Sequence, residues 1–257
     1  MTRRRWIADE FSADRAALTG EHAAHLSRTL RARPGQEFEV ACGDQVRRAT
    51  VSSVSDDRVE FALGEEITSS DVVPITLLLA VFKFDRMEWA IEKCTELNVT
   101  RIVPIVARRS EKHLALAVDK RVERWRRIAR EASEQSRRTT PPEISDPMKL
   151  KDTLAQTAST NKSLVIPTGE TRCPPPPALN IVLAETEHEA LLSDILRAHE
   201  DIGALTLAIG PEGGWTDEEL QLFANSHWIA ASLGDTILRA ETAAIATLAI
   251  ARALTHG

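Results

Sequence analysis

The chain has 257 residues, of which 43% are hydrophobic and 27% charged, and its formal net charge is −6. These values are ordinary for a globular protein of one large domain or two smaller ones. No apolar run approaches the length of about 18 residues that a membrane-spanning helix needs, and the basic start lacks the apolar stretch of a secretory signal.

Residues 1–70 are predicted to form a small β-rich unit. Strands are expected over residues 37–40, 48–51 and 59–63, because β-forming side chains cluster there between turn-forming residues. A short helix is expected before them, with Ala23, Leu26 and Leu30 on its apolar side. Several basic side chains make RNA docking a plausible role for this unit: Arg3, Arg4, Arg5, Arg28, Arg31 and Arg33.

The pattern changes near Ser69-Ser70-Asp71, which we take as the boundary of a second domain over residues 71–257. Residues 75–82 form a continuous apolar run, as in a strand that is buried on both faces. Asp85 is expected to cap the following helix with Glu88 as its capping-box partner. Another strand is expected over residues 101–106. This strand–helix–strand order predicts an α/β domain with a parallel sheet.

A long helix is predicted over residues 119–135, with Val122, Trp125, Ala129 and Ala132 facing inward. It lies within a basic block, residues 101–138, which carries 12 basic and 5 acidic side chains. Such a block is a candidate polyanion surface, although a solvated helix face is the commoner meaning of a charge run. Its arginines at 121, 124, 127, 130 and 138 are expected to remain largely free for solvent or phosphate.

The rest of the chain continues the alternation of strands and helices. Strands are expected over residues 163–167, 180–184, 205–209 and 228–231, and helices over 187–199 and 240–254. Asp217-Glu218-Glu219 places acidic groups in the first turn of a further helix, where the helix dipole favours them. The last helix is apolar nearly all round, which predicts burial against the sheet or a partner subunit.

Two glycine-bearing turns follow neighbouring predicted strands. The first is Gly210-Pro211-Glu212-Gly213-Gly214, and the second begins at Leu233-Gly234 and leads into Arg239 and Glu241. Glycine lets backbone groups approach a ligand closely, and turns at the carboxyl ends of neighbouring strands usually mark a ligand pocket. Taken alone, either glycine-bearing segment could equally be a tight turn that binds no ligand.

The common catalytic and nucleotide-binding motifs are absent. No phosphate-binding GxxxxGK[ST], GxGxxG or GxSxG motif occurs, and the three cysteines, Cys42, Cys94 and Cys173, have no metal-site spacing. A reduced cytoplasmic protein without a metal fits best. The remaining chemistry is a backbone-lined pocket with two acids, Glu212 and Glu241, and a guanidinium, Arg239. Such a pocket suits a small, nearly neutral cofactor, with Arg239 free to face an anionic substrate.

These motifs together resemble the RsmE family of SPOUT methyltransferases. Besides both glycine turns and Ile237-Leu238-Arg239-Ala240-Glu241-Thr242, the resemblance includes a central signature around Lys83, Lys93 and Arg109-Ser110. The N-terminal pattern of His22, His25-Leu26 and Leu30-Arg31 is also similar. The sequence departs from the family pattern at Asp235-Thr236, where Pro-Arg or a similar pair is common, so that a basic side chain is lost. It also departs at Trp6-Ile7, where an aromatic pair is typical.

The resemblance implies a PUA-like β-barrel, an α/β domain with a C-terminal deep trefoil knot, and a homodimer. It implies methylation of N3 of a uridine in small-subunit ribosomal RNA with S-adenosylmethionine as methyl donor. Arg239 and Glu212 are the candidate catalytic residues, and Arg239 is expected to stabilise the uracil anion. The alternatives are a structural ion pair between Arg239 and Glu241 or Glu212, and a purely structural role for Glu212.

The implied binding residues fall into two sets. The cofactor would be held by Leu183, Ala184, Ile209, Gly210, Pro211, Gly213, Gly214, Ser232, Leu233, Gly234, Ile237 and Leu238. The RNA would be contacted by Arg4, Arg31, Arg108, Arg109, Lys112, Arg124, Arg127 and Arg138. Two rival functions share the fold: a non-catalytic RNA-binding or ribosome-assembly protein, and a methyltransferase that acts on transfer RNA or on a ribose hydroxyl.

Overall fold

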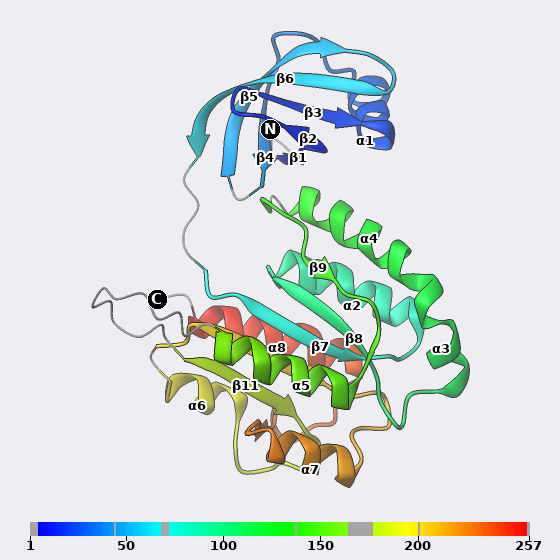
Figure 1. Ribbon diagram of the computed structural model, residues 1–257, viewed down its shortest axis with the longest axis vertical. Coiled ribbons are helices and arrows are strands. Elements are labelled where there is room, and N and C mark those ends of the chain that lie inside the picture. The colour runs from blue at the N-terminus through cyan, green and yellow to red at the C-terminus, as the bar shows by residue number, and fades with distance from the viewer. Residues whose placement is uncertain are drawn as a thin grey trace. The chain divides into compact units, whose positions relative to one another are not determined.

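The computed structural model describes residues 5–43, 45–67, 72–136, 138–163, 177–199 and 201–255 (Figure 1). The chain divides into two compact units, Met1–Asp71 with Arg130–Pro141, and Val72–Ala129 with Pro142–Gly257. The predicted boundary at Ser69-Ser70-Asp71 lies outside the described residues, so the division at residue 70 stays a prediction. Among the residues described, no helix is long and apolar enough to cross a lipid bilayer.

The first unit is built on a curled sheet of mixed direction. The strand order is β1-β4-β5-β6-β3-β2, and only the β1–β4 pair is parallel. Trp6, Leu18 and Phe61 are fully or almost fully buried at its core. The elements are β1 (Arg5–Ile7), β2 (Glu10–Phe11), β3 (Arg15–Thr19), α1 (Gly20–Ala24), the π-helix η1 (His25–Thr29), β4 (Glu37–Cys42), β5 (Gln45–Val54) and β6 (Arg58–Ile67).

The predicted strands of this unit are confirmed within β4, β5 and β6, whereas β1, β2 and β3 were not predicted. The short helix is also confirmed, and Ala23 and Leu26 are buried as expected. Leu30 is 49% exposed, so its predicted burial is wrong. The cause is the π-helical turn η1, which adds a residue to the turn and rotates Leu30 away from the face of Leu26.

The His22 and His25 side chains contact different neighbouring residues. The His22 ring lies 3.9 Å from an Asp9 oxygen and 3.5 Å from Glu134, and the His25 ring packs against Trp6. Burial, followed by the nearby Arg130 guanidinium, lowers the pKa of His22. These contacts are those of packed side chains.

The second unit has a parallel sheet at its centre. Its order is β10-β8-β7-β12-β11-β13, with β9 paired to β8, and every pairing is parallel. The predicted α/β class with a parallel sheet is therefore confirmed. The strands are β7 (Ile75–Ala80), β8 (Arg101–Val106), β9 (Glu143–Ile144), β10 (Met148–Lys149), β11 (Ala178–Leu183), β12 (Ala204–Ile209) and β13 (Ile229–Ala231).

Helices cover both faces of this sheet, because alternate side chains of its apolar strands point to opposite sides. Along β7, Leu77 and Leu79 belong to the core beneath α2, α4, α6 and α8, while Leu78 joins the opposite core with α5 and α7. Figure 1 shows α5 in front of the sheet and α8 behind it. The helices are α2 (Phe84–Glu96), α3 (Lys112–Ala117), the 3-10 helix η2 (Val118–Arg121), α4 (Val122–Gln135), α5 (Leu150–Ser163), α6 (Leu192–Arg197), α7 (Asp217–Asn225) and α8 (Ala240–Thr255).

Several predicted helix limits are wrong. Helix α2 begins at Phe84 without a side-chain cap, because the Glu88 carboxylate is bound by Arg124 instead of closing a capping box with Asp85. Helix α6 begins at Leu192, not at residue 187. The reason is that the Glu187 carboxylate accepts hydrogen bonds from the backbone N–H groups of Glu189 and Ala190, which form a turn before the helix. Helices α3 and α5 were not predicted.

Other expectations fall partly on residues that the structure does not describe. Of the predicted strand over residues 163–167, Ser163 ends helix α5 and the others lie outside the described residues. Cys173 also lies outside them, while Cys42 and Cys94 are buried free thiols. Burial raises the pKa of the Cys94 thiol, so this thiol is unreactive. The trefoil knot implied by the family resemblance stays a prediction.

A capping box on helix α7 fixes the segment that follows β12. The Thr216 hydroxyl accepts from the Glu219 backbone N–H at 3.3 Å, and the Glu219 carboxylate accepts from the Thr216 N–H at 3.0 Å. The same carboxylate accepts from the Arg108 backbone N–H at 2.8 Å and is only 3% exposed. Glu219 therefore joins α7 to the loop after β8, and the predicted acidic first turn of this helix is confirmed.

We expect Glu219→Ala to lower the free energy of unfolding by about 2–4 kcal/mol, because it removes a helix cap and leaves the Arg108 N–H without its acceptor. Urea denaturation followed by circular dichroism measures this change. Glu218→Ala is the matched control, since Glu218 lies in the same helical turn but is exposed, where it contacts the Thr216 side chain and approaches Arg108 at 3.7 Å. Equal losses from the two variants would contradict the role given to Glu219.

Candidate active site

The loops that follow β11, β12 and β13 enclose one pocket of about 460 Å³. These three strands are neighbours in the sheet and run in the same direction, so their carboxyl ends meet at one edge. Such an edge is the usual place for a ligand in an open α/β sheet, and the volume lies within the range of about 300–1,000 Å³ typical of small-molecule sites.

The first wall is the loop of residues 210–214, which Trp215 holds in place. The Trp215 indole N–H donates to the Leu183 carbonyl at 3.1 Å, so the end of β11 is joined to the loop after β12. The Gly214 N–H donates to the Pro211 carbonyl at 2.8 Å. Gly214 has φ +69°, and a Cβ at Gly210 would lie 3.2 Å from the Trp215 ring. Glycine is therefore required at both positions for this loop to close over the indole.

The second wall is the turn of residues 232–239 between β13 and α8. The Gly234 N–H donates to the Ser232 hydroxyl at 3.1 Å, and Gly234 has φ +121°, a conformation that side chains rarely adopt. Ile237 is 81% exposed and lines the pocket. Asp235 and Thr236, where the sequence departs from the family pattern, also line the pocket and are exposed.

The structure brings together nearly all the residues predicted to bind the cofactor. The exception is Gly213, which is not part of the pocket wall and whose carbonyl accepts from the Arg109 guanidinium at 2.7 Å. The predicted residues in the wall are Leu183, Ala184, Ile209, Gly210, Pro211, Gly214, Ser232, Leu233, Gly234, Ile237 and Leu238.

Both candidate catalytic residues line the pocket, but they are in different electrostatic situations. Glu212 accepts from the Arg86 guanidinium at 2.8 Å, and Arg86 also lies 3.8 Å from the Glu241 carboxylate. The Arg239 side chain is exposed and has no hydrogen bond or ion pair among the described residues. The structural ion pair considered for Arg239 is therefore absent from the described part of the chain, and Arg86 takes both carboxylates.

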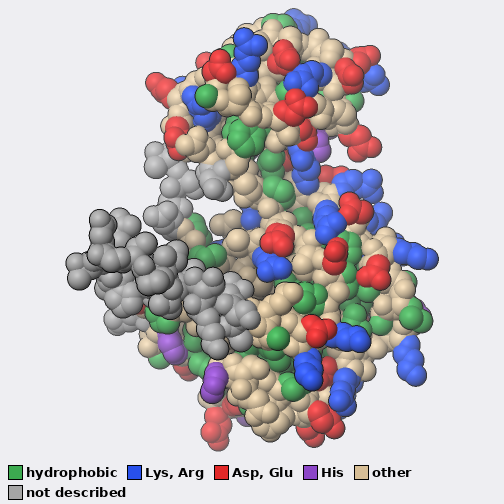
Figure 2. Space-filling model, in the orientation of Figure 1, with side chains coloured by type: hydrophobic (Ala, Val, Ile, Leu, Met, Phe, Trp, Pro, Cys, Tyr) green, Lys and Arg blue, Asp and Glu red, His purple; other side chains and the backbone are tan. Residues whose placement is uncertain are grey.

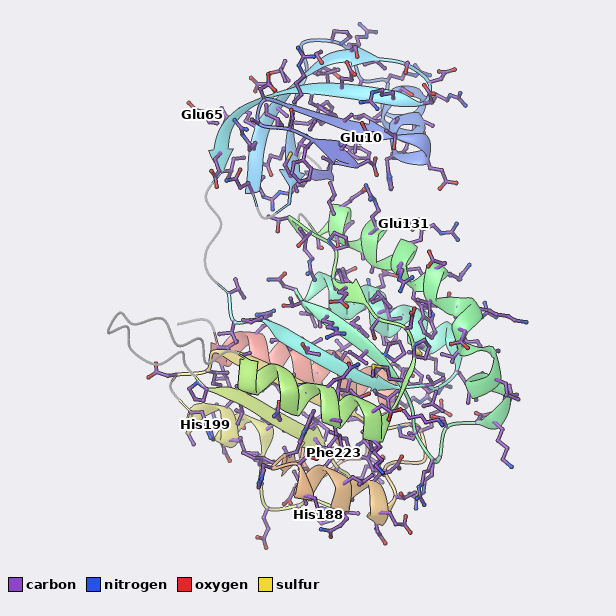
Figure 3. The ribbon with its side chains drawn as sticks, viewed as in Figure 1. Glu10, Glu65, Glu131, His188, His199 and Phe223 are labelled. Atoms are coloured by element: carbon purple, nitrogen blue, oxygen red, sulfur yellow. The ribbon has the colours of Figure 1, made fainter. Side chains whose placement is uncertain are left out.

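Sequence reasoning missed three charged or titratable residues of the pocket wall, Arg86, Glu185 and His188. Glu185 and His188 lie in the loop between β11 and α6, and His188 is labelled in Figure 3. The position after a parallel strand could have marked them. Arg86 lies in the first turn of α2, where a cation opposes the helix dipole, and this unfavourable position was its signal.

The basic block is more fully paired than predicted. Arg124 makes a two-bonded pair with Glu88, Arg130 binds Asp9, and Arg138 donates to the Thr140 carbonyl. The expectation that these side chains remain largely free is wrong, because neighbouring acidic groups and carbonyls occupy them. Arg121 lies over the Phe84 ring, and Arg127 is exposed without a partner among the described residues.

The other residues predicted to contact RNA lie in several settings. Arg109 donates to the Gly213 and Trp215 carbonyls, so it supports the first wall of the pocket. Arg108 approaches Glu218 at 3.7 Å. Lys112 and Arg31 are exposed without partners among the described residues, and Arg4 lies outside them. On the face that Figure 2 draws, Lys and Arg side chains are interspersed with Asp and Glu.

The fold and the pocket define a class of protein. Residues 69–252 match the family model of an RNA methyltransferase domain, and both walls of the pocket lie within this match. The chain is thus a member of the RNA methyltransferase class.

Comparisons over nearly the whole chain define the family more narrowly. The chain is 30% identical to the ribosomal RNA small subunit methyltransferase E of Rickettsia conorii over 92% of this chain and 89% of that protein. The Bacillus subtilis protein of the same name is 29% identical over 90% of this chain and 87% of that protein. The chain belongs to the ribosomal RNA small subunit methyltransferase E family, the RsmE family.

Two solved structures agree with this assignment. The ribosomal RNA small subunit methyltransferase E of Neisseria gonorrhoeae, bound to S-adenosyl methionine, has a TM-score of 0.78 at 27% identity and covers 98% of both chains. A methyltransferase of Legionella pneumophila in complex with the same cofactor has a TM-score of 0.77 at 25% identity, with 98% coverage of both chains. The family resemblance read from the sequence is therefore confirmed.

Proposed function

We propose that this chain methylates N3 of a uridine in small-subunit ribosomal RNA, with S-adenosylmethionine as methyl donor. The observation that carries the proposal is the pocket between the two glycine-bearing walls, lined by the Arg239 guanidinium, which has no partner in the described part of the chain. The family membership and the cofactor bound by similar structures support the choice of methyl donor.

The pocket fits the cofactor in chemistry as well as in volume. Its wall combines apolar side chains with three carboxylates, Glu185, Glu212 and Asp235, against two guanidinium groups, Arg86 and Arg239. An excess of negative charge suits a ligand that carries a sulfonium and an ammonium group. The proposed contacts are the residues of the two walls named above, with Leu183 and Ala184 at the end of β11 as the third side.

S-adenosylmethionine, when bound, supplies an electrophilic methyl group on a sulfonium. The N3 proton of uracil must first pass to solvent, so that the substrate presents N3 as an anion, because the protonated imide nitrogen is a poor nucleophile. We assign Arg239 to stabilise this anion, since its guanidinium is exposed at the pocket and engaged by no other group among the described residues. Glu212 is already bound by Arg86, so we assign it an orienting role in the first wall.

The decisive experiment compares ribosomal RNA from a wild-type strain and a strain lacking this gene. Nucleoside mass analysis of the small-subunit RNA is expected to find one 3-methyluridine missing in the deletion strain, and the purified chain is expected to restore it. Loss of a ribose methyl group or of a transfer RNA modification instead would favour the rival methyltransferase function. Intact modification together with no binding of S-adenosylmethionine in calorimetry would favour the non-catalytic alternative.

We also propose that the chain acts as a homodimer. The support is apolar surface on the second unit, where Trp89 on α2 is 48% exposed and Ile237 in the pocket turn is 81% exposed. Thr242, Ala249 and Ala253 leave an exposed line of small side chains along α8. Sedimentation equilibrium that gives the mass of a single chain at micromolar concentration would contradict this proposal.

RNA binding is proposed for the N-terminal unit and for two cations of the second unit, Lys112 and Arg127, which are exposed and have no partner among the described residues. We expect affinity for small-subunit RNA to fall steeply with salt, and Arg127→Ala and Lys112→Ala each to lower the slope of log Kd against log salt by about 1. Arg124→Ala should change the slope less, because that guanidinium is already paired with Glu88. Filter binding at several salt concentrations measures the slopes, and a slope near zero for the wild type would contradict electrostatic binding.

A further inference from the structure

The position of Arg86 needs explanation, since a cation in the first turn of a helix opposes the helix dipole. Arg86 lies in α2 just beyond the carboxyl end of β7, and its side chain is 30% exposed at the pocket wall. Two carboxylates compensate for the unfavourable dipole, that of Glu212 at 2.8 Å and that of Glu241 at 3.8 Å. These ion pairs are what hold the guanidinium at this place.

The two carboxylates come from the two different walls of the pocket. Glu212 belongs to the loop after β12, and Glu241 lies in the first turn of α8, directly after the turn that follows β13. The Glu241 side chain is 5% exposed, and its Oε2 has no hydrogen-bond partner among the described residues. A buried carboxylate without a nearby cation is costly, so Arg86 is the group that makes Glu241 tolerable.

Arg239 lines the same pocket as Arg86 and Glu212. A long flexible guanidinium beside an uncompensated carboxylate forms an ion pair. Arg86 occupies Glu212 and Glu241, and the Arg239 guanidinium has no partner among the described residues.

We infer that Arg86 is a positioning residue of the methyl-transfer site: by holding Glu212 and Glu241 it keeps Arg239 available for the substrate anion. This inference rests on the proposed function, in which Arg239 acts on that anion. It assigns Arg86 no contact with the reacting atoms.

A double-mutant cycle separates this role from a merely structural one. Arg86→Ala is expected to lower kcat by roughly ten- to a hundredfold, because Glu212 captures Arg239, with a smaller change in KM for S-adenosylmethionine. Adding Glu212→Gln to Arg86→Ala is expected to recover part of the lost rate, because a neutral amide does not hold Arg239, whereas the Glu241 carboxylate remains. A double variant as slow as Arg86→Ala would overturn the inference. Arg86→Gln replaces Arg86→Ala if the latter does not fold, with the same expected outcomes.

Arg126→Ala is the matched control, because Arg126 also holds two carboxylates, those of Glu123 and Asp146, away from the pocket. Its kcat is expected to remain that of the wild type, and a loss as large as that of Arg86→Ala would count against a specific role for Arg86. The comparison is made on the full-length chain, with thermal melting of every variant recorded in parallel.

A readout without methyl transfer distinguishes failure of this inference from failure of the proposed function. Phenylglyoxal modifies accessible arginines, and peptide mass spectrometry gives the rate at Arg239 alone. We expect this rate to fall several-fold in Arg86→Ala and to recover in part in the double variant. An unchanged rate of modification at Arg239 overturns the inference. A wild-type chain that transfers no methyl group overturns the proposed function instead. In that case the modification rate at Arg239 still tests the inference.

Discussion

Replacing Arg239 with alanine is expected to slow methyl transfer by about 10²- to 10³-fold, the usual effect of removing one pre-positioned group that stabilises a developing anion. The guanidinium lines the pocket and has no partner among the described residues, so its removal disturbs no ion pair there. Affinity for S-adenosylmethionine should therefore change little. Single-turnover transfer of a labelled methyl group to small-subunit RNA measures the rate, and calorimetry measures cofactor affinity.

Arg197→Ala is a suitable control for this experiment. Arg197 is a similarly exposed arginine on α6, and within the described ranges it pairs only with Asp194, one helical turn earlier. Its removal should leave both the transfer rate and the cofactor affinity unchanged. Full activity of Arg239→Ala would remove Arg239 from the mechanism, and a large loss of cofactor affinity would assign it to binding instead.

Truncation of Trp215 is expected to have the largest effect on stability. Trp215→Ala should lower the free energy of unfolding by about 3–5 kcal/mol, because it opens a cavity between the sheet and α7. Trp215 is 6% exposed and packs edge-on against Phe223, with ring centroids 5.0 Å apart. Phe223 lies on α7 and is labelled in Figure 3. Denaturation in guanidinium chloride measures this loss.

Trp215→Phe separates packing from hydrogen bonding. It keeps most of the ring but leaves the Leu183 carbonyl without the indole donor, at a cost of about 1–3 kcal/mol, and it should also weaken cofactor binding because Leu183 lines the pocket. Trp228→Phe is the matched control, since Trp228 packs on the same Phe223 ring at 5.0 Å and has no hydrogen bond from its indole among the described residues. Equal effects of both variants on cofactor affinity would contradict this role for Trp215.

The main elements of the fold could be predicted because their signals are local. Residues 75–80 and 204–209 are short apolar runs that form central strands of the parallel sheet, and each is buried on both faces. The limits of helices were less predictable, because they depend on partners distant in sequence. Asp85 and Glu88 have the spacing of a capping box in sequence. In the structure, Arg124 on helix α4 instead donates a hydrogen bond to the Glu88 carboxylate.

The same distinction applies to the pocket. Gly210, Gly214 and Gly234 marked both walls, since turns after strands have a sequence signal that does not depend on their neighbours. Arg109 was expected to contact RNA, but its guanidinium is bound by backbone carbonyls of the first wall. No sequence pattern gives the location of a carbonyl 104 residues further along the chain.

The sequence by itself determined the parallel α/β unit, the two glycine-bearing turns and the family, because apolar periodicity, glycine and short motifs are properties of neighbouring residues. Only the tertiary structure decided which charges meet. Arg86 holds Glu212 and Glu241 while Arg239 is left without a partner among the described residues. The physical reason is that an ion pair depends on the separation of its groups in space. These groups follow the carboxyl ends of β7, β12 and β13, which are separated in sequence but meet at one edge of the sheet.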